Sequence, residues 1–227
     1  MSDTIISLIR NSGKYFELIT AIIGTIFFYK YKHTALKYFL YLLWYITLTE
    51  FIGWYVRETG NLAYIDENGL IYNKWLYNIL GFITFNTMYF IYFKNLETKV
   101  FRKWVKMFLI LFSTAYFLNW VFVQNFIKES AELPRVIGSI FLIISIIFYF
   151  IELLRSEKIL IFHKTLLFWV SVGMLLFYSG TIPFMLKRNG FMLIPGIHKL
   201  YLIMYVLFYT MYSTFIFGFI WSKKESH

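Results

Sequence analysis

Cysteine is missing from this chain of 227 residues, and proline and charge are scarce. Without cysteine, the chain has no disulfide, no thiolate metal ligand and no cysteine nucleophile. Three prolines and 12 glycines are too few for collagen-like or low-complexity repeats. Charged residues make up 15% of the sequence, whereas an average soluble domain has roughly 25%.

Apolar and aromatic residues dominate instead. Hydrophobic residues account for 59% of the chain, and the mean hydropathy is +0.63. A soluble protein of this size has no room to bury 27 Phe, 19 Tyr and 7 Trp, so the composition excludes disorder and indicates a membrane as the solvent. The net charge is +10. Basic residues of membrane proteins usually lie in loops that face anionic lipid, so we expect lipid rather than nucleic acid as their partner.

Seven stretches are long and apolar enough to be predicted as membrane-spanning helices, which need about 17–25 residues. They cover residues 15–31, 36–56, 75–93, 104–126, 136–154, 165–186 and 200–221. These runs are too long and continuous for the strands of a membrane barrel, which alternate over about ten residues. The predicted fold is all-α, a single seven-helix transmembrane domain over residues 1–227 with short loops.

The distribution of Lys and Arg predicts the orientation. Thirteen of the 22 basic residues lie in or directly beside the first, third and fifth loops and in the C-terminal tail. The positive-inside rule then places the N-terminus outside and the C-terminus in the cytoplasm. The bias towards Ile, Lys and Asn is typical of AT-rich bacterial genomes, so we expect the bacterial inner membrane. The third loop and the start of the fourth span hold a basic patch that could face anionic lipid or dock a cytoplasmic partner. Its residues are Lys94, Lys99, Arg102, Lys103 and Lys106.

Patterns for catalysis and metal binding are missing from the sequence. The four histidines lie in loops, at span ends or in the tail, and none has a partner at metal-ligand spacing. Both aspartates fall outside the spans, which argues against an intramembrane aspartyl protease. There is no Gly-rich phosphate loop, and the last span has no lysine for a retinal Schiff base. We therefore predict a protein that is not an enzyme and has no cofactor or metal.

Carboxylates at membrane depth are costly and are functional candidates by default. Glu50 is the strongest, because it shares one helix face with Thr47, Trp54 and Arg57. It could bind a cation, a proton or a hydrogen-bond donor, or it could only fix packing. Glu17 is interpreted as a solvated group in the first turn of its helix, where a negative charge suits the helix dipole.

Neutral polar residues gather in the outer half of the predicted bundle. We predict an outward-opening pocket for a small polar or amine-bearing ligand, although the tyrosines of the last span could equally serve packing and membrane anchoring. The predicted lining residues are Glu50, Asn78, Asn119, Ser179 and Tyr205. Because Pro183 cannot donate to the carbonyl of Ser179, a kink is expected there, and with Gly180 it could open a gap between helices.

Residues 166–178, LLFWVSVGMLLFY, are followed by Gly180 and Pro183. This stretch resembles the sixth span of small bacterial seven-helix sensor input modules, which often precede histidine kinase or other output domains. The resemblance implies a seven-helix sensor with its N-terminus outside, and it carries over no binding residue. Because the sequence stops shortly after the last span, a sensor of this kind is expected to signal through a separate protein.

The function predicted from the sequence is an integral membrane sensor or accessory protein that signals to a separate effector. The alternative is a small-solute transporter or channel that uses Glu50 as its coupling group. The partner is expected to be an effector protein or a second copy of the chain in a homo-oligomer.

Overall fold

The computed structural model describes residues 3–65, 67, 69, 71–156, 160–186 and 198–224. Most of these residues lie in long α-helices, joined by two 3-10 turns, η1 (Phe28–Lys30) and η4 (Phe162–Lys164). The long helices are α1 (Asp3–Ile26), α2 (Lys37–Thr59), α3 (Lys74–Asn95), α4 (Lys99–Leu118), α5 (Glu132–Arg155), α6 (Leu166–Leu186) and α8 (His198–Trp221). A short π-helix, η2 (Asn119–Val123), extends α4.

The helical fold class predicted from the sequence is confirmed, and each predicted span overlaps one of the long helices. Two local features differ from the prediction. Helix α1 begins at Asp3, well before the predicted start at residue 15. The mixed polar and apolar residues before Tyr15 are helical although they do not form an apolar run. A small hairpin also follows α2, in which β1 (Tyr64–Ile65) pairs antiparallel with β2 (Ile71–Tyr72).

Among the described residues, five helices are long and apolar enough to cross a membrane. They are α2, α4 together with η2, α5, α6 and α8. Helix α1 falls short because its first half is polar, and α3 carries Asn78 and Asn86 among its apolar residues. Several apolar helices in one bundle suggest, by composition, a multi-pass membrane protein.

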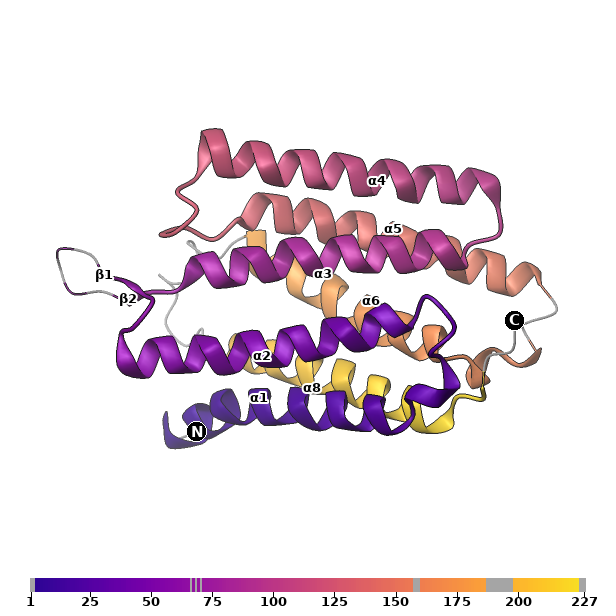
Figure 1. Ribbon diagram of the computed structural model, residues 1–227, viewed down its shortest axis with the longest axis horizontal. Helices are drawn as coiled ribbons and strands as arrows, with labels where there is room; N and C mark the ends of the chain where they lie inside the picture. Colours follow the sequence, from indigo (N-terminus) through magenta and orange to yellow (C-terminus); the bar gives the residue numbers. More distant parts are fainter. Residues whose placement is uncertain are drawn as a thin grey trace.

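The helices run side by side and alternate in direction (Figure 1). The N-terminus and the β1–β2 hairpin lie at one end of the bundle, called here the hairpin end, and the C-terminus lies at the opposite end (Figure 1). Helix α3 packs against α2, α4 and α5, while α4 lies at the edge of the bundle (Figure 1). Helices α1 and α8 are neighbours, so the two ends of the sequence meet along the length of the bundle.

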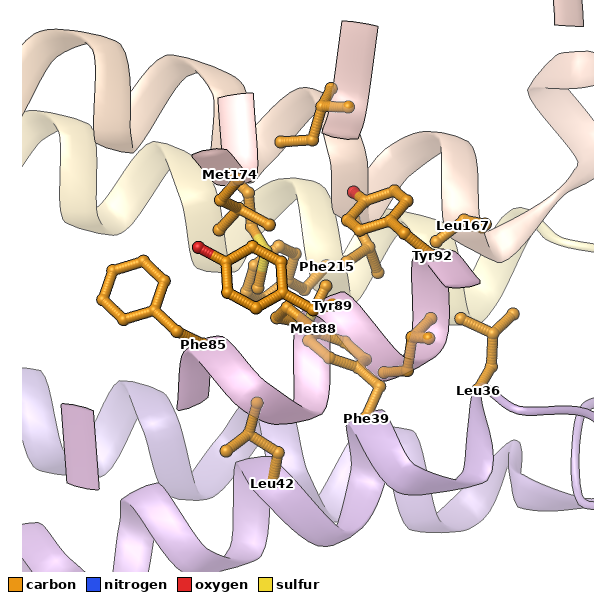
Figure 2. Packing of buried hydrophobic residues seen from close by; sticks show 14 of the residues in the cluster. Leu36, Phe39, Leu42, Phe85, Met88, Tyr89, Tyr92, Leu167, Met174 and Phe215 are labelled. Carbon is orange, nitrogen blue, oxygen red and sulfur yellow. The ribbon is translucent and has the colours of Figure 1, made fainter. Parts of the chain in front are cut away.

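The core lies where α3 faces α2, α6 and α8, and it is rich in aromatic side chains (Figure 2). Phe85, Met88, Tyr89 and Tyr92 are buried at helical spacing along one face of α3. Two tyrosine hydroxyls on this face of α3 have partners, as buried polar groups usually do. Tyr89 donates to the carbonyl of Gly138 at 2.7 Å, and the Tyr92 hydroxyl lies 2.8 Å from Oγ of Ser171.

Helices α6 and α8 approach each other closely, and glycines make this approach possible. A Cβ atom on Gly173 would lie 2.2 Å from Oγ1 of Thr214, and one on Gly180 would lie 2.4 Å from Cδ1 of Leu207. Gly180 therefore does not border the gap expected from the sequence, because Leu207 fills that space. Pro183 lies inside α6, and the helix continues past it to Leu186.

Candidate functional site

A cavity of about 280 Å³ lies between helices from both ends of the chain, towards the hairpin end. Its volume is close to the lower limit of ligand pockets, which run from about 300 to 1,000 Å³. Helix α1 contributes two charged groups, α2 contributes one, and α6 and α8 contribute an apolar wall. The lining residues are Gly13, Lys14, Glu17, Glu50, Phe177, Met204, Tyr205 and Phe208.

Glu17 is the most enclosed charged group of this cavity, with only 5% of its side chain exposed. Oε1 accepts a hydrogen bond of 3.2 Å from the hydroxyl of Tyr212 on α8. Within the described part of the chain, its other oxygen, Oε2, is buried and has no hydrogen-bond partner. Its interpretation as a solvated group at a helix start is wrong, because α1 begins at Asp3 and places Glu17 in the helix interior.

Glu50 reaches the same cavity from α2. It is half-buried, and its Oε2 accepts a hydrogen bond of 3.2 Å from the hydroxyl of Tyr77 on α3. The approach of Tyr77 depends on Gly53, since a Cβ atom there would lie 2.6 Å from the tyrosine oxygen. Each of the two carboxylates is thus held by a tyrosine from a neighbouring helix.

Lys14 supplies the positive charge at the cavity. Its Nζ lies 4.1 Å from the centroid of the Trp54 ring, with Tyr15 and Phe51 at 5.2 and 5.8 Å. Cations are attracted to aromatic faces at these distances. The ammonium is therefore held by aromatic rings of α1 and α2, and its charge opposes only part of the negative charge of the two glutamates.

Of the five residues predicted to line a ligand pocket, Glu50 and Tyr205 lie at this cavity. Asn119 instead begins the π-helix, and its Nδ2 donates to Oε1 of Gln124, just after that helix, at 2.8 Å. Ser179 lies on the exposed side of α6, and its hydroxyl donates to the carbonyl of Leu176. Polar character along the sequence therefore did not reveal which helix faces converge.

Asn78 also lies outside the cavity, because it anchors the connection between α4 and α5. Its Nδ2 donates to the carbonyls of Phe126 and Glu129, both at 2.9 Å. Its Oδ1 accepts from the backbone N–H of Ala131 at 3.1 Å and from Nη2 of Arg135 at 3.3 Å. The amide therefore uses both its donor and its acceptor atoms for structure, which leaves little capacity for a ligand.

The basic patch predicted from the sequence lies at the start of α4 and the end of α3, at the end of the bundle opposite the hairpin. Four of its members are exposed, namely Lys94, Lys99, Lys103 and Lys106. Arg102 is half-buried, with its guanidinium 5.0 Å from the centroid of the Phe93 ring. The backbone at this turn is held by Glu152 of α5, which accepts hydrogen bonds from the N–H groups of Glu97 (2.5 Å) and Thr98 (3.2 Å).

Lys30 is a structural residue that the sequence did not reveal. Its Nζ donates to the carbonyls of Phe219, Ile220 and Ser222 at 3.0, 2.8 and 2.7 Å. These carbonyls lie at the C-terminal end of α8, where a cation is favoured by the helix dipole and satisfies otherwise unpaired groups. Lys30 therefore joins the turn after α1 to the last turn of α8.

No group of three or more histidine, aspartate and glutamate side chains that could hold a metal occurs among the residues the structure describes. No family model matches the chain, and neither curated proteins nor solved structures give a significant match. The functional interpretation therefore comes from the geometry of the site itself.

Proposed function

We propose that the chain is a seven-span protein of a cell membrane, with the hairpin end outside and the C-terminal end in the cytoplasm. Exposed apolar side chains support this proposal, because so many of them on one protein surface would favour aggregation in water. On α4 and α5 they include Ile110, Phe117, Ile140 and Ile147. The orientation is supported by the exposed lysines at the start of α4, which suit an anionic inner leaflet.

In this setting we propose a sensor that binds a small ligand from the outside and signals to a separate effector. The observation that carries the proposal is the cavity near the hairpin end, where carboxylates of α1 and α2 face an apolar wall from α6 and α8. Intramembrane carboxylates are rare and mark functional sites. The resemblance of residues 166–178 to sensor input modules points in the same direction.

Transmission would use the pairing of α1 with α8. Ligand bound between these helices changes their spacing at the hairpin end, while Lys30 holds them together at the opposite end. The turn after α1 and the end of α8 would then move relative to the basic patch of Lys94–Lys106, where anionic lipid or an effector could dock. A bistable arrangement of packed helices is the usual means of such coupling.

The lack of cysteine permits a clean test of access to the cavity. Met204→Cys places one thiol at the cavity, Lys224→Cys places one near the C-terminus, and Ser145→Cys places one in the buried part of α5. Intact cells are treated with a small membrane-impermeant cationic thiosulfonate. We expect labelling of the first variant only, with labelling of the second after the cells are permeabilised. An unlabelled first variant, or labelling of the second in intact cells, overturns the proposal.

A proton-coupled carrier is the second candidate, and the specific observation in its favour is that Glu17 joins Glu50 at one cavity. Carriers place their coupling carboxylates between helices in this way. The purified protein in liposomes with a trapped pH-sensitive dye distinguishes the two functions. Proton flux above that of protein-free liposomes, lost in Glu50→Gln and retained in Glu58→Gln, favours the carrier. Flux equal to that of protein-free liposomes favours the sensor.

The effector is sought with a photo-crosslinking amino acid at Lys103 on the basic patch, and at the exposed Ile140 of α5 as the matched control. A sensor predicts a stoichiometric partner crosslinked from position 103 and not from position 140. Crosslinking to lipid or to a second copy of the chain only, from either position, contradicts a separate effector.

A further inference from the structure

We infer that the cavity binds a small organic molecule with a primary ammonium group on an apolar or aromatic body, and that Glu17 accepts a hydrogen bond from that ammonium. This inference rests on the proposed ligand-binding function and specifies the ligand. It goes beyond the sequence-based pocket, which did not include Glu17.

The unpartnered oxygen of Glu17 calls for a hydrogen-bonding ligand. Oε2 is buried at a cavity and lacks a hydrogen-bond partner in the described chain, although Oε1 is paired with Tyr212. A buried polar atom without a partner is costly, and it is usually satisfied by water or by a ligand. A carboxylate only accepts hydrogen bonds. For the ionised side chain the missing partner is therefore a donor, and a cationic donor also compensates the charge and keeps the carboxyl ionised.

The charges at the cavity favour a cationic ligand over an anionic one. Glu17 and Glu50 bring two negative charges when both are ionised, and Lys14 brings one positive charge. The ammonium of Lys14 is held by the face of Trp54 at 4.1 Å. Arg57 does not line the cavity but also acts electrostatically on Glu50. A ligand ammonium supplies Glu17 with a cationic partner, whereas an anionic ligand would add negative charge beside two carboxyl groups in a site of low dielectric.

The opposite wall of the cavity suits an apolar body. Phe177 of α6 and Met204 and Phe208 of α8 supply apolar surface, and Tyr205 adds another ring. Aromatic faces attract cations in addition to burying hydrocarbon. At about 280 Å³ the cavity has room for a compact ligand such as an arylalkylamine.

A primary ammonium fits better than a quaternary one. Glu17 Oε2 requires a hydrogen-bond donor, and a primary ammonium carries three N–H groups that could reach Glu17 and Glu50 together. A quaternary ammonium offers charge to the aromatic rings but no donor to the oxygen. The two ligand types therefore separate a hydrogen-bonded site from a site that only attracts cations.

Four related probes test the inference on the full chain in lipid nanodiscs at pH 7. They are phenethylamine, its trimethylammonium analogue, phenylacetate and 2-phenylethanol, and binding is measured as a shift in thermal unfolding and by calorimetry. We expect binding of phenethylamine, about ten-fold or more weaker binding of the trimethylammonium analogue, and no binding of the acid or the alcohol, since hydrogen bonds to charged groups are worth about 1.5–3 kcal/mol.

Variants of the two carboxylates assign the site. Glu17→Gln is expected to weaken phenethylamine binding by about ten-fold or more, and Glu50→Gln is a second variant that tests the same cavity should Glu17→Gln fail to fold. Glu58→Gln lies on the exposed end of α2 and is the matched control, with unchanged binding expected. Phenethylamine should also slow thiosulfonate labelling of Met204→Cys, a measurement that leaves both glutamates intact.

The outcomes separate this inference from the proposed function. If Met204→Cys is labelled from outside but no probe binds, or if the alcohol or the acid binds as well as the amine, the ligand class is wrong and the outward cavity stands. Unchanged amine binding in both glutamate variants likewise overturns the assignment of Glu17 and Glu50. If the cysteine is not labelled from outside, the proposed function itself fails.

Discussion

Asn78 and Glu17 are both buried polar residues towards the hairpin end of the bundle, yet they are arranged in opposite ways. The Asn78 amide makes four hydrogen bonds and joins α3 to the segment between α4 and α5. Glu17 makes one, to Tyr212, and keeps a buried oxygen without a partner beside a cavity. Burial of a polar group therefore does not by itself mark a binding site, and the proposed site depends instead on an unused hydrogen-bonding atom beside a cavity.

The largest expected effect comes from replacing Asn78, whose amide makes four hydrogen bonds. Asn78→Leu leaves two carbonyls, one backbone N–H and Arg135 short of partners. We therefore expect a loss of about 3 kcal/mol or more in the free energy of unfolding. Thermal unfolding in mild detergent measures it. Asn61→Ala, on the exposed segment after α2, is the control and should change stability by less than about 0.5 kcal/mol. Similar effects of the two substitutions would contradict the structural role of Asn78.

Lys30 provides the same test at the opposite end of the molecule. Lys30→Met keeps the length of the side chain but removes the ammonium that three carbonyls of α8 share. We expect a loss of about 1–2 kcal/mol, since the last carbonyls of a helix lose both a donor and a favourable charge. Lys32→Met, in the turn that follows, serves as the control. Equal stabilities of the two variants would show that Lys30 does not join α1 to α8.

Glu17→Gln should raise the free energy of unfolding, whereas the two preceding substitutions lower it. A neutral amide keeps an acceptor for Tyr212 and removes a carboxyl that is expensive to bury, so we expect a gain of about 1 kcal/mol in stability. The same thermal unfolding experiment measures it, with Glu58→Gln as the exposed control. A loss of stability as large as that of Asn78→Leu would place Glu17 among the structural residues.

Tyr77→Phe should have the smallest effect. It removes one hydrogen bond to Glu50, a half-buried group, and we expect a loss of about 0.5–1 kcal/mol. The double variant with Glu50→Gln should cost less than the sum of the two single changes, because both remove the same contact. Additive effects in this double-mutant cycle would mean that Tyr77 does not hold Glu50 in position.

The helices could be predicted from the sequence, because the long apolar runs, bounded by basic and polar residues, have the length that a helix needs to cross a bilayer. The position of Glu50 could also be predicted, since its face of α2 has a clear helical spacing. Asn78 could not be placed, because its partners are backbone groups of the segment between α4 and α5, and no side-chain pattern reveals that this segment folds back onto α3.

The burial of Glu17 could not be predicted for a different reason. The polar residues before it suggested that the helix began nearby, although α1 begins at Asp3. One signal was present in the sequence: Glu17, Thr20, Ala21 and Gly24 follow the 3-4-7 spacing of one helix face, and all four are buried. The side of the helix that faces α8 could therefore be found once the helix was extended, but the cavity itself depends on side chains of α6 and α8 that pattern alone does not bring together.

The central claim is that Glu17 serves a ligand at the expense of stability. The most direct test is the unfolding temperature of the wild-type chain and of Glu17→Gln, each with and without phenethylamine. We predict that the variant is more stable than the wild type without the amine, and that the amine stabilises the wild type clearly more than the variant. A variant that is less stable and still gains the same stabilisation from the amine would contradict the claim.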